Sequence, residues 1–306
     1  MSAAADLLPF VQFDFPGRLG PDHGRYLVRS ASGGVEHVLV VGGVAGLATS
    51  MRRGRRRRGR ARAAREEAPE VPVTRATVIR PGGFASGEEA EAWLRQTSGS
   101  GEEAGELVGE GLGILNRALH AHSVATQDPF GGGVSEAAAL ATRIGFGTGD
   151  ELADGRWSEA VVVPVRPGPR RRSDALRPQE RLAAALGRRE ATDACETLLL
   201  RARADLEGER MREAALQLRV GLETLLAEVS AEAASAAASG AAAALASEQL
   251  ARQADDLRLL AARRGITGDA ANEALAGELS ADREAEVAET IGLCERVLRR
   301  RRVLAR

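Results

Sequence analysis

Five short stretches in the first half of the chain carry the apolar patterns of β-strands. One alternates apolar and polar side chains, and the others are apolar or β-branched runs bounded by glycine, proline or serine. They lie at residues 11–15, 25–29, 38–41, 71–80 and 160–165. The run at 38–41 is continuously apolar and stops at Gly42 and Gly43, so we expect a buried strand that ends in a glycine turn.

Two helices are expected between these strands. Ser86 precedes Glu88 and Glu89 and then a short apolar run that ends at Leu94, which is the pattern of a short helix with a capped N-terminus. The apolar periodicity of residues 103–124 predicts a second, longer helix. About five short strands and two helices form a mixed domain, so we assign residues 1–166 to the N-terminal domain of an α+β protein.

The second half of the chain has the apolar spacing of packed helices. Four segments repeat a 4-3 spacing, and each gives a narrow apolar stripe that one helix could not bury alone. The stripes are Cys195, Leu199, Ala202 and Leu206; Met211, Ala215, Leu218, Leu222, Leu225 and Val229; Leu250, Ala254, Leu257 and Ala261; and Val287, Ile291, Cys294 and Leu298. Because Gly208 separates the first two, they predict an antiparallel hairpin, and residues 175–306 predict a four-helix bundle.

Two further segments stand out by composition. Residues 167–174 combine two prolines, a glycine and three arginines without an aliphatic or aromatic side chain, so we place the linker between the domains there. Between residues 231 and 246, eleven of sixteen residues are alanine, the strongest helix former, and Gly240 interrupts the run. We expect a helix with a break at that glycine.

Composition excludes several classes of chemistry. The chain has 306 residues, 44% of them apolar, which is enough for one large or two ordinary domains. All 42 of its Lys-plus-Arg positions are arginine, and a chain without lysine can neither form a Schiff base nor supply a P-loop lysine. Cys195 and Cys294 both lie on helical stripes, which indicates core positions in a reducing compartment. We expect a cytoplasmic protein without a cofactor.

No membrane association is predicted. Residues 1–15 have neither the basic start nor the long apolar run of a signal peptide. Residues 38–51 are apolar or small and are followed by arginines, the order found at the cytoplasmic end of a membrane span. Their fourteen residues include three glycines, however, and a membrane-spanning helix needs about 20 apolar residues.

Arginine is concentrated in clusters. Nine arginines and no acid fall between Arg52 and Arg65, interrupted by two glycines, which is the composition of a solvated loop over residues 52–67. The ten glutamates and three arginines of residues 66–110 offset this charge, and the formal net charge of the chain is −1. Phosphate contacts, if the clusters make them, would come from Arg52, Arg53, Arg55, Arg56, Arg57, Arg58, Arg299, Arg300, Arg301 and Arg302. Non-specific nucleic-acid binding is therefore an alternative, although not the favoured one.

Residues 38–48 resemble the start of a flavin- or nicotinamide-binding Rossmann unit, in which a strand leads through a glycine turn into a helix. The motif is incomplete, because Val41 stands where the first glycine of G-x-G-x-x-G belongs when Gly43 and Gly46 take the other two. Residues 51–59 also lack the apolar face with which the expected helix would pack on a sheet. Dinucleotide binding therefore ranks among the least favoured functions.

A candidate polar cluster lies at the end of the helix predicted for residues 103–124. Its members are Asn116, Arg117, His120, His122 and Asp128. On a helix, side chains two residues apart diverge, whereas two metal ligands need a spacing of three or four, so we predict no metal site at the histidines. His122 is expected to bond to Asp128 or to a backbone carbonyl. The spacing from Arg117 to His122 resembles the R-x-x-x-x-H signature of HEPN-type ribonucleases, which implies an all-helical fold that the surrounding strands do not match.

Three segments resemble uncharacterised proteins of high-GC bacteria, and the resemblance spans most of the chain. They are residues 115–122, 176–182 and 212–219, and no activity is implied by them. No serine, cysteine or carboxylate pair has the pattern of a catalytic group. The sequence thus predicts a non-catalytic interaction or assembly protein whose helical domain binds a protein partner or a second copy, with nucleic-acid binding as the alternative and an enzyme third.

Overall fold

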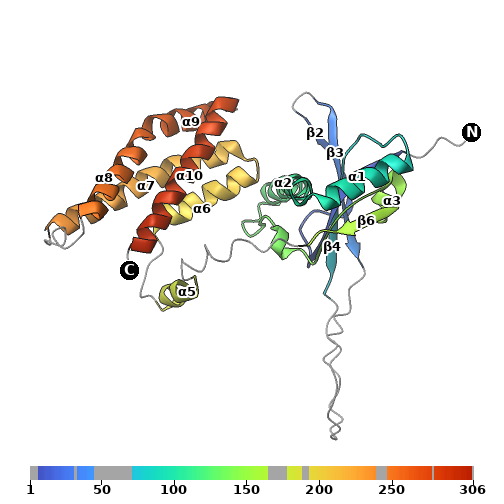
Figure 1. Cartoon of the computed structure of the whole chain (residues 1–306), viewed down its shortest axis with the longest axis horizontal. Helices are drawn as coiled ribbons and strands as arrows, with labels where there is room; N and C mark the ends of the chain where they lie inside the picture. Colours follow the sequence, from blue (N-terminus) through green and yellow to red (C-terminus); the bar gives the residue numbers. More distant parts are fainter. Residues whose placement is uncertain are drawn as a thin grey trace, which may run out of the picture. The chain divides into compact units, whose positions relative to one another are not determined.

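The computed structural model describes residues 6–30, 33–44, 71–164, 178–187, 193–238, 247–277 and 279–304. The chain divides into two compact units, Met1–Arg166 and Pro167–Arg306. A six-stranded sheet with helices forms the first unit and helices form the second (Figure 1), so the predicted α+β fold class is confirmed. The predicted linker at residues 167–174 and the predicted arginine-rich loop at residues 52–67 lie outside the described residues.

All five strand pairs of the sheet are antiparallel. The strands are β1 (Leu7–Pro16), β2 (Gly24–Arg29), β3 (Val35–Val44), β4 (Val73–Ile79), β5 (Ala141–Thr148) and β6 (Glu159–Val162), and their order is β2-β3-β4-β1-β5-β6. The prediction of about five strands missed β5, because Gly145 and Gly147 interrupt its apolar pattern. A Cβ at Gly145 would lie 2.2 Å from the carbonyl oxygen of Glu159, so β6 can approach β5 only at a glycine.

Strand β3 contradicts the expected glycine turn. The strand does not end at Gly42 but continues to Val44, and Gly43 pairs with Thr74 of β4. Both neighbours of β3 run antiparallel to it. A dinucleotide-binding unit instead ends its first strand at the glycines and returns through a helix to a parallel strand. The resemblance of this segment to a Rossmann unit therefore does not extend to the topology of the sheet.

Two helices pack on one face of the sheet. They are α1 (Gly87–Gly99) and α2 (Gly101–Thr126), and each begins at a serine whose hydroxyl accepts a backbone hydrogen bond, from Glu89 in α1 and from Glu103 in α2. The core on this face joins side chains of both helices to strand residues such as Phe13. The two expected helices are thus present, with a 3-10 turn, η1 (Glu136–Ala138), and a short helix, α3 (Gly149–Ala153), in addition.

The opposite face of the sheet carries a buried ion pair network around Asp14, which is 3% exposed. Arg75 of β4 donates to both carboxylate oxygens of Asp14 at 2.7 and 3.0 Å, and Arg143 of β5 donates to one of them at 2.7 Å. The Trp157 ring lies 5.5 and 5.3 Å from the two guanidinium carbons. A lone carboxylate would be too costly to bury at this position, so the arginines of both neighbouring strands neutralise it.

The helical unit contains α5 (Pro178–Leu186), α6 (Ala194–Glu207), α7 (Met211–Ala238), α8 (Ser247–Ala262), α9 (Arg264–Ala276) and α10 (Ala281–Leu304). The stripes predicted for α6, α7 and α10 supply most of its core, including Cys195, Leu222 and Ile291. The stripe predicted for α8 was wrong in part: Leu260 is the fully buried side chain, whereas Ala261 is exposed. The expected break at Gly240 lies outside the described residues.

Helix α9 was not predicted, because its buried face is made of small side chains. That face consists of Thr267, Ala270, Ala271 and Ala274. Small residues let α9 lie close to α7, where the guanidinium of Arg212 donates to the carbonyl oxygen of Ala274 at 2.9 Å. An apolar pattern search finds no stripe in such a segment, so the four-helix prediction is replaced by a six-helix unit within the described residues.

We expect Asp14→Asn to lower the free energy of unfolding by about 3 to 5 kcal/mol at neutral pH, because Arg75 and Arg143 would lose their shared carboxylate. Burial acts to raise the pKa of Asp14, but the hydrogen bonds and charges of the two arginines outweigh it and hold that pKa below its ordinary value of 3.8. This stabilisation is therefore present at pH values well above the ordinary 3.8 and is lost as the pH falls through the lowered value. Urea unfolding at several pH values measures it.

The contradicting result for Asp14→Asn would be a destabilisation that stays the same between neutral pH and pH 2. In that case the loss would come from packing and not from the charge. Asp22→Asn is the matched control, since Asp22 is exposed and its carboxylate forms no ion pair with a described residue.

Candidate functional site

The polar cluster predicted on α2 is divided among separate structural contacts. Asn116 fixes the backbone of Val134: its amide nitrogen donates to the carbonyl oxygen at 3.0 Å, and its amide oxygen accepts from the backbone nitrogen at 2.7 Å. Asp128 accepts a hydrogen bond from the backbone nitrogen of Phe130 at 2.9 Å, which closes a local turn. Both residues therefore hold the chain that follows α2.

The two histidines of this cluster differ in environment. His120 is exposed, whereas His122 is half-buried and its ring lies against Gly20 in the loop between β1 and β2. The hydrogen bond expected between His122 and Asp128 is not among the described contacts of either side chain. Arg117, which follows Asn116 on α2, is half-buried. No group of three or more potential metal ligands occurs in the part of the chain that the structure describes.

The four C-terminal arginines predicted to contact phosphate all pair with carboxylates of the helical unit. Arg299 pairs with Glu295 one turn earlier in α10, and Arg300 pairs with Asp256 of α8. Arg301 pairs with Glu232 of α7, and Arg302 pairs with Asp193 and Glu196 at the start of α6. The other six arginines of that prediction, at residues 52, 53 and 55–58, lie outside the described residues.

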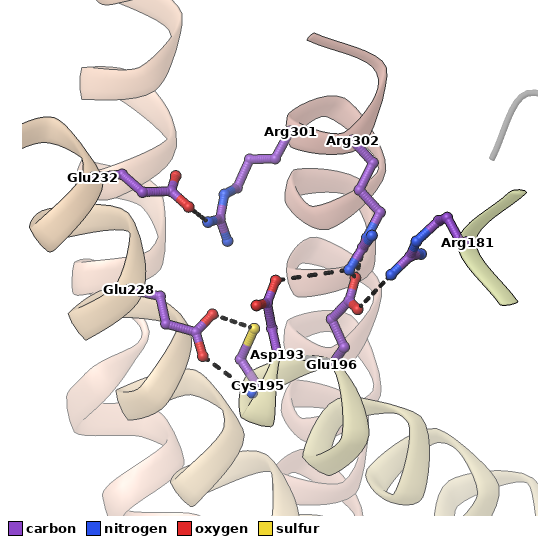
Figure 2. A network of polar contacts seen from close by, with 8 residues as sticks. All are labelled: Arg181, Asp193, Cys195, Glu196, Glu228, Glu232, Arg301 and Arg302. Atoms are coloured by element: carbon purple, nitrogen blue, oxygen red, sulfur yellow. Dashed lines mark hydrogen bonds and ion pairs between the residues drawn. The ribbon is translucent and has the colours of Figure 1, made fainter. Parts of the chain in front are cut away.

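Figure 2 shows the densest of these contacts, which we call the C-terminal ionic network. It consists of Arg181, Asp193, Cys195, Glu196, Glu228, Glu232, Arg301 and Arg302, from α5, α6, α7, α10 and the residue before α6. Glu196 is its centre, because it accepts from Arg302 and also from Arg181 at 3.1 Å. One carboxylate thus ties α5 and α10 to the first turn of α6.

The helix ends explain the placement of these charges. Asp193 is the residue at which α6 begins and Glu196 lies in its first turn, where the helix dipole favours negative charge. Arg301 and Arg302 lie in the last turn of α10, where the dipole favours positive charge. Burial, together with the nearby charges of Glu228 and Glu196, raises the pKa of Asp193 above its ordinary value. Carboxylates therefore outnumber guanidinium groups around Asp193.

Both cysteines are held as neutral thiols. The Cys195 thiol donates to Glu228 at 2.8 Å, and the Cys195 backbone nitrogen donates to the second oxygen of Glu228 at 3.3 Å. Burial, the hydrogen bond to Glu228 and its charge raise the pKa of Cys195 far above the ordinary range. Burial raises the pKa of Cys294 to about 12. A nucleophilic cysteine needs a lowered pKa, so neither thiol has the environment of a catalytic group.

A buried histidine that sequence patterns did not single out lies between the sheet and α2. His37 is 8% exposed, its Nε2 lies 3.0 Å from Glu110, and Glu110 also pairs with Arg80. The Nδ1 atom of His37 is buried without a hydrogen-bond partner among the described residues. The adjoining cavity has a volume of about 10 Å³, enough for a single water molecule. The Nε2 atom of His37 is thus paired and its Nδ1 atom is not, and the cavity beside the ring is too small for a substrate.

A groove between α7 and α8 was also missed by sequence reasoning. It has a volume of about 470 Å³ and is lined by Glu223, Leu226, Ala227, Ser230, Leu257, Arg258, Ala261 and Arg264. The 4-3 pattern assigned Leu257 and Ala261 to the bundle core. Leu257 is half-buried and packs against that core, whereas Ala261 is exposed. Periodicity identifies an apolar helix face, but it does not tell which part of that face a neighbouring helix leaves open.

Comparison with known protein families, with characterised proteins and with solved structures gives no match. Within the described ranges, no helix combines the length and the apolar character that a membrane span requires.

We expect Arg302→Gln to lower the free energy of unfolding by about 2 kcal/mol, because Glu196 would lose a charged donor in a half-buried position. Arg299→Gln is the matched control on the same helix: its side chain is 51% exposed, and the change should stay within about 0.5 kcal/mol. Chemical denaturation of both variants measures the difference. A loss for Arg302→Gln that also stays within about 0.5 kcal/mol would show that Arg302 adds no stability through this network.

Proposed function

We propose that this chain is a non-catalytic interaction or assembly protein, and that its helical unit supplies the binding surface. The groove between α7 and α8 is the observation that supports this most. Its floor includes Leu226 and Leu257, while Ala227 and Ala261 are small and exposed, so a partner can approach both helices closely. This is the form of a surface that receives the apolar face of an amphipathic helix.

Charged residues surround the apolar floor of the groove. The guanidinium of Arg264 donates to Glu223 at 2.8 Å, and this pair spans from α9 to α7 at the edge of the groove. Arg258 lies on the α8 side and pairs with Asp255 of its own helix. An apolar centre with a polar rim is the usual anatomy of a protein interface.

A second copy of the chain is the partner that we favour. Helix α5 has no buried residue, and its Leu182 and Leu186 are 53% and 77% exposed at a spacing of four. Two leucines at this spacing form the kind of helix face that an apolar groove binds. The chain therefore offers both a groove and a possible ligand for it, which would give a heterologous contact between copies. Another protein with a similar helix is the alternative partner.

Nucleic-acid binding remains the alternative function, with less support. Every described arginine of the predicted phosphate-contact set already pairs with a carboxylate, which would compete with phosphate for its guanidinium. An enzyme ranks third. The antiparallel neighbours of β3 argue against dinucleotide binding, and the position of Arg117 and His122 in the unit with the sheet argues against a HEPN-type ribonuclease.

A cytoplasmic location is part of this proposal. It is supported by Cys195 and Cys294, which are both free, buried and protonated, as expected for a protein that folds in a reducing environment.

We expect the full chain to self-associate reversibly, and Ala227→Glu to weaken the association about tenfold or more, because a charge would enter the apolar groove. Ala233→Glu is the control, since Ala233 is exposed on the same helix but does not line the groove. Sedimentation velocity over a concentration series measures both. A chain that stays monomeric throughout would exclude the second copy as partner, and equal effects of the two substitutions would exclude the groove.

A further inference from the structure

The loop between β1 and β2 encloses a pocket at one end of the sheet. Residues 18–23 form one side, and the facing ends of β3 and β4, at residues 43–44 and 72–74, form the other. The volume is about 450 Å³, which lies within the range of small-molecule sites, roughly 300–1,000 Å³. This pocket belongs to the sheet unit and is independent of the groove in the helical unit.

The walls of the pocket are fixed by hydrogen bonds and by one close contact. Gly17 donates to the carbonyl oxygen of Pro72 at 2.7 Å, and the Thr74 hydroxyl donates to the carbonyl oxygen of Gly17 at 2.7 Å. Gly20 has a φ of +111°, and a Cβ there would lie 2.9 Å from the ring of His122. The ring of His122 thus packs against the loop at Gly20. The backbone around the pocket is therefore held before a ligand binds, which reduces the entropy cost of binding.

Three ionisable side chains of this loop line the pocket and have no polar partner among the described residues. Arg18, Asp22 and His23 are exposed, and their side chains form no hydrogen bond or ion pair with any described residue. Arg18 therefore differs from the arginines of the C-terminal ionic network, which carboxylates already occupy. A guanidinium with free donors in a concave site is a receptor for a planar or tetrahedral oxyanion, which it can bind through two parallel hydrogen bonds.

The imidazole of His23 is exposed and lies against β3 in this pocket. It lies over Gly43 of β3, where a Cβ would come within 2.8 Å of its Cε1 atom. Only glycine at this point of the strand leaves room for the ring. The neighbouring Gly42 has no such contact, since nothing lies within 4 Å of a Cβ built there. Two adjacent glycines of one strand therefore have different roles.

We propose that this pocket binds a small molecule that carries an oxyanion, either a carboxylate or a phosphate. Arg18 supplies the bidentate donor and His23 a second donor from the floor. Asp22 lies on the same loop and would repel a bare anion, so it selects ligands with a hydroxyl or amino group that can donate to its carboxylate. The ligand class is thus a small polar metabolite in which an oxyanion accompanies a hydrogen-bond donor.

Residue-resolved NMR of the full chain tests this proposal with inorganic phosphate and acetate as probes, each titrated at constant ionic strength. A residue-resolved measurement is needed because the chain has 42 arginines. We expect saturable shifts at residues 18–23 and Gly43, and binding about tenfold weaker or more in Arg18→Gln. Arg25→Gln, an exposed arginine of β2 outside the pocket, should bind as the wild type does. Saturation by phosphate alone or by acetate alone identifies which oxyanion the pocket accepts.

Three further variants separate the site from general charge effects. Gly43→Val should displace His23 and weaken binding, whereas Gly42→Val should leave it unchanged. Asp22→Asn should strengthen phosphate binding, because a like charge is removed. The absence of saturable shifts at residues 18–23 with both probes would overturn the proposal, as would equal losses in Arg18→Gln and Arg25→Gln.

Discussion

Pairing of arginine with carboxylate is the interaction on which both units of this protein depend. Asp14 in the sheet and Glu196 in the helical unit each receive two guanidinium groups from different structural elements. The planar guanidinium suits this arrangement, because its several donors are fixed in directions that a carboxylate can accept in pairs. Since the chain contains no lysine, every such contact is made by arginine. These acids therefore add side-chain links between β1, β4 and β5, which the sheet already pairs, and between α5, α6 and α10.

This pairing changes what the arginine content implies for function. From the sequence alone, a cluster of arginines on a helix looks like a phosphate-binding surface. In the structure, Arg300, Arg301 and Arg302 each form an ion pair with a carboxylate on a different helix. The cluster therefore links the helices of this unit. Arg18 lacks such a partner among the described residues, and it lies in a pocket. An ion pair with a carboxylate therefore identifies an arginine that holds the fold together, and clustering of arginines along the sequence does not.

Apolar periodicity predicted the fold class and most of the core, but failed where small residues replace large ones. The stripes of α6, α7 and α10 were identified because leucine, isoleucine and valine recur every three or four residues. Helix α9 buries alanine and threonine, and β5 contains Gly145 and Gly147, so neither has an apolar pattern. The pocket and the groove depend on contacts between segments far apart in sequence, such as His122 with Gly20. One sequence does not encode such contacts in a form that spacing can identify.

Salt dependence of nucleic-acid binding decides whether Arg299 to Arg302 act within the molecule or contact phosphate. The measurement compares the wild type with Arg299→Gln/Arg300→Gln, which changes the two most exposed members of the cluster, at 51% and 47% side-chain exposure against 17% and 21% for the other two. If these arginines act within the molecule, both proteins have the same affinity and the same slope of log K against log salt. A slope shallower by about 1.8, the value for two lost phosphate contacts on duplex DNA, would contradict it.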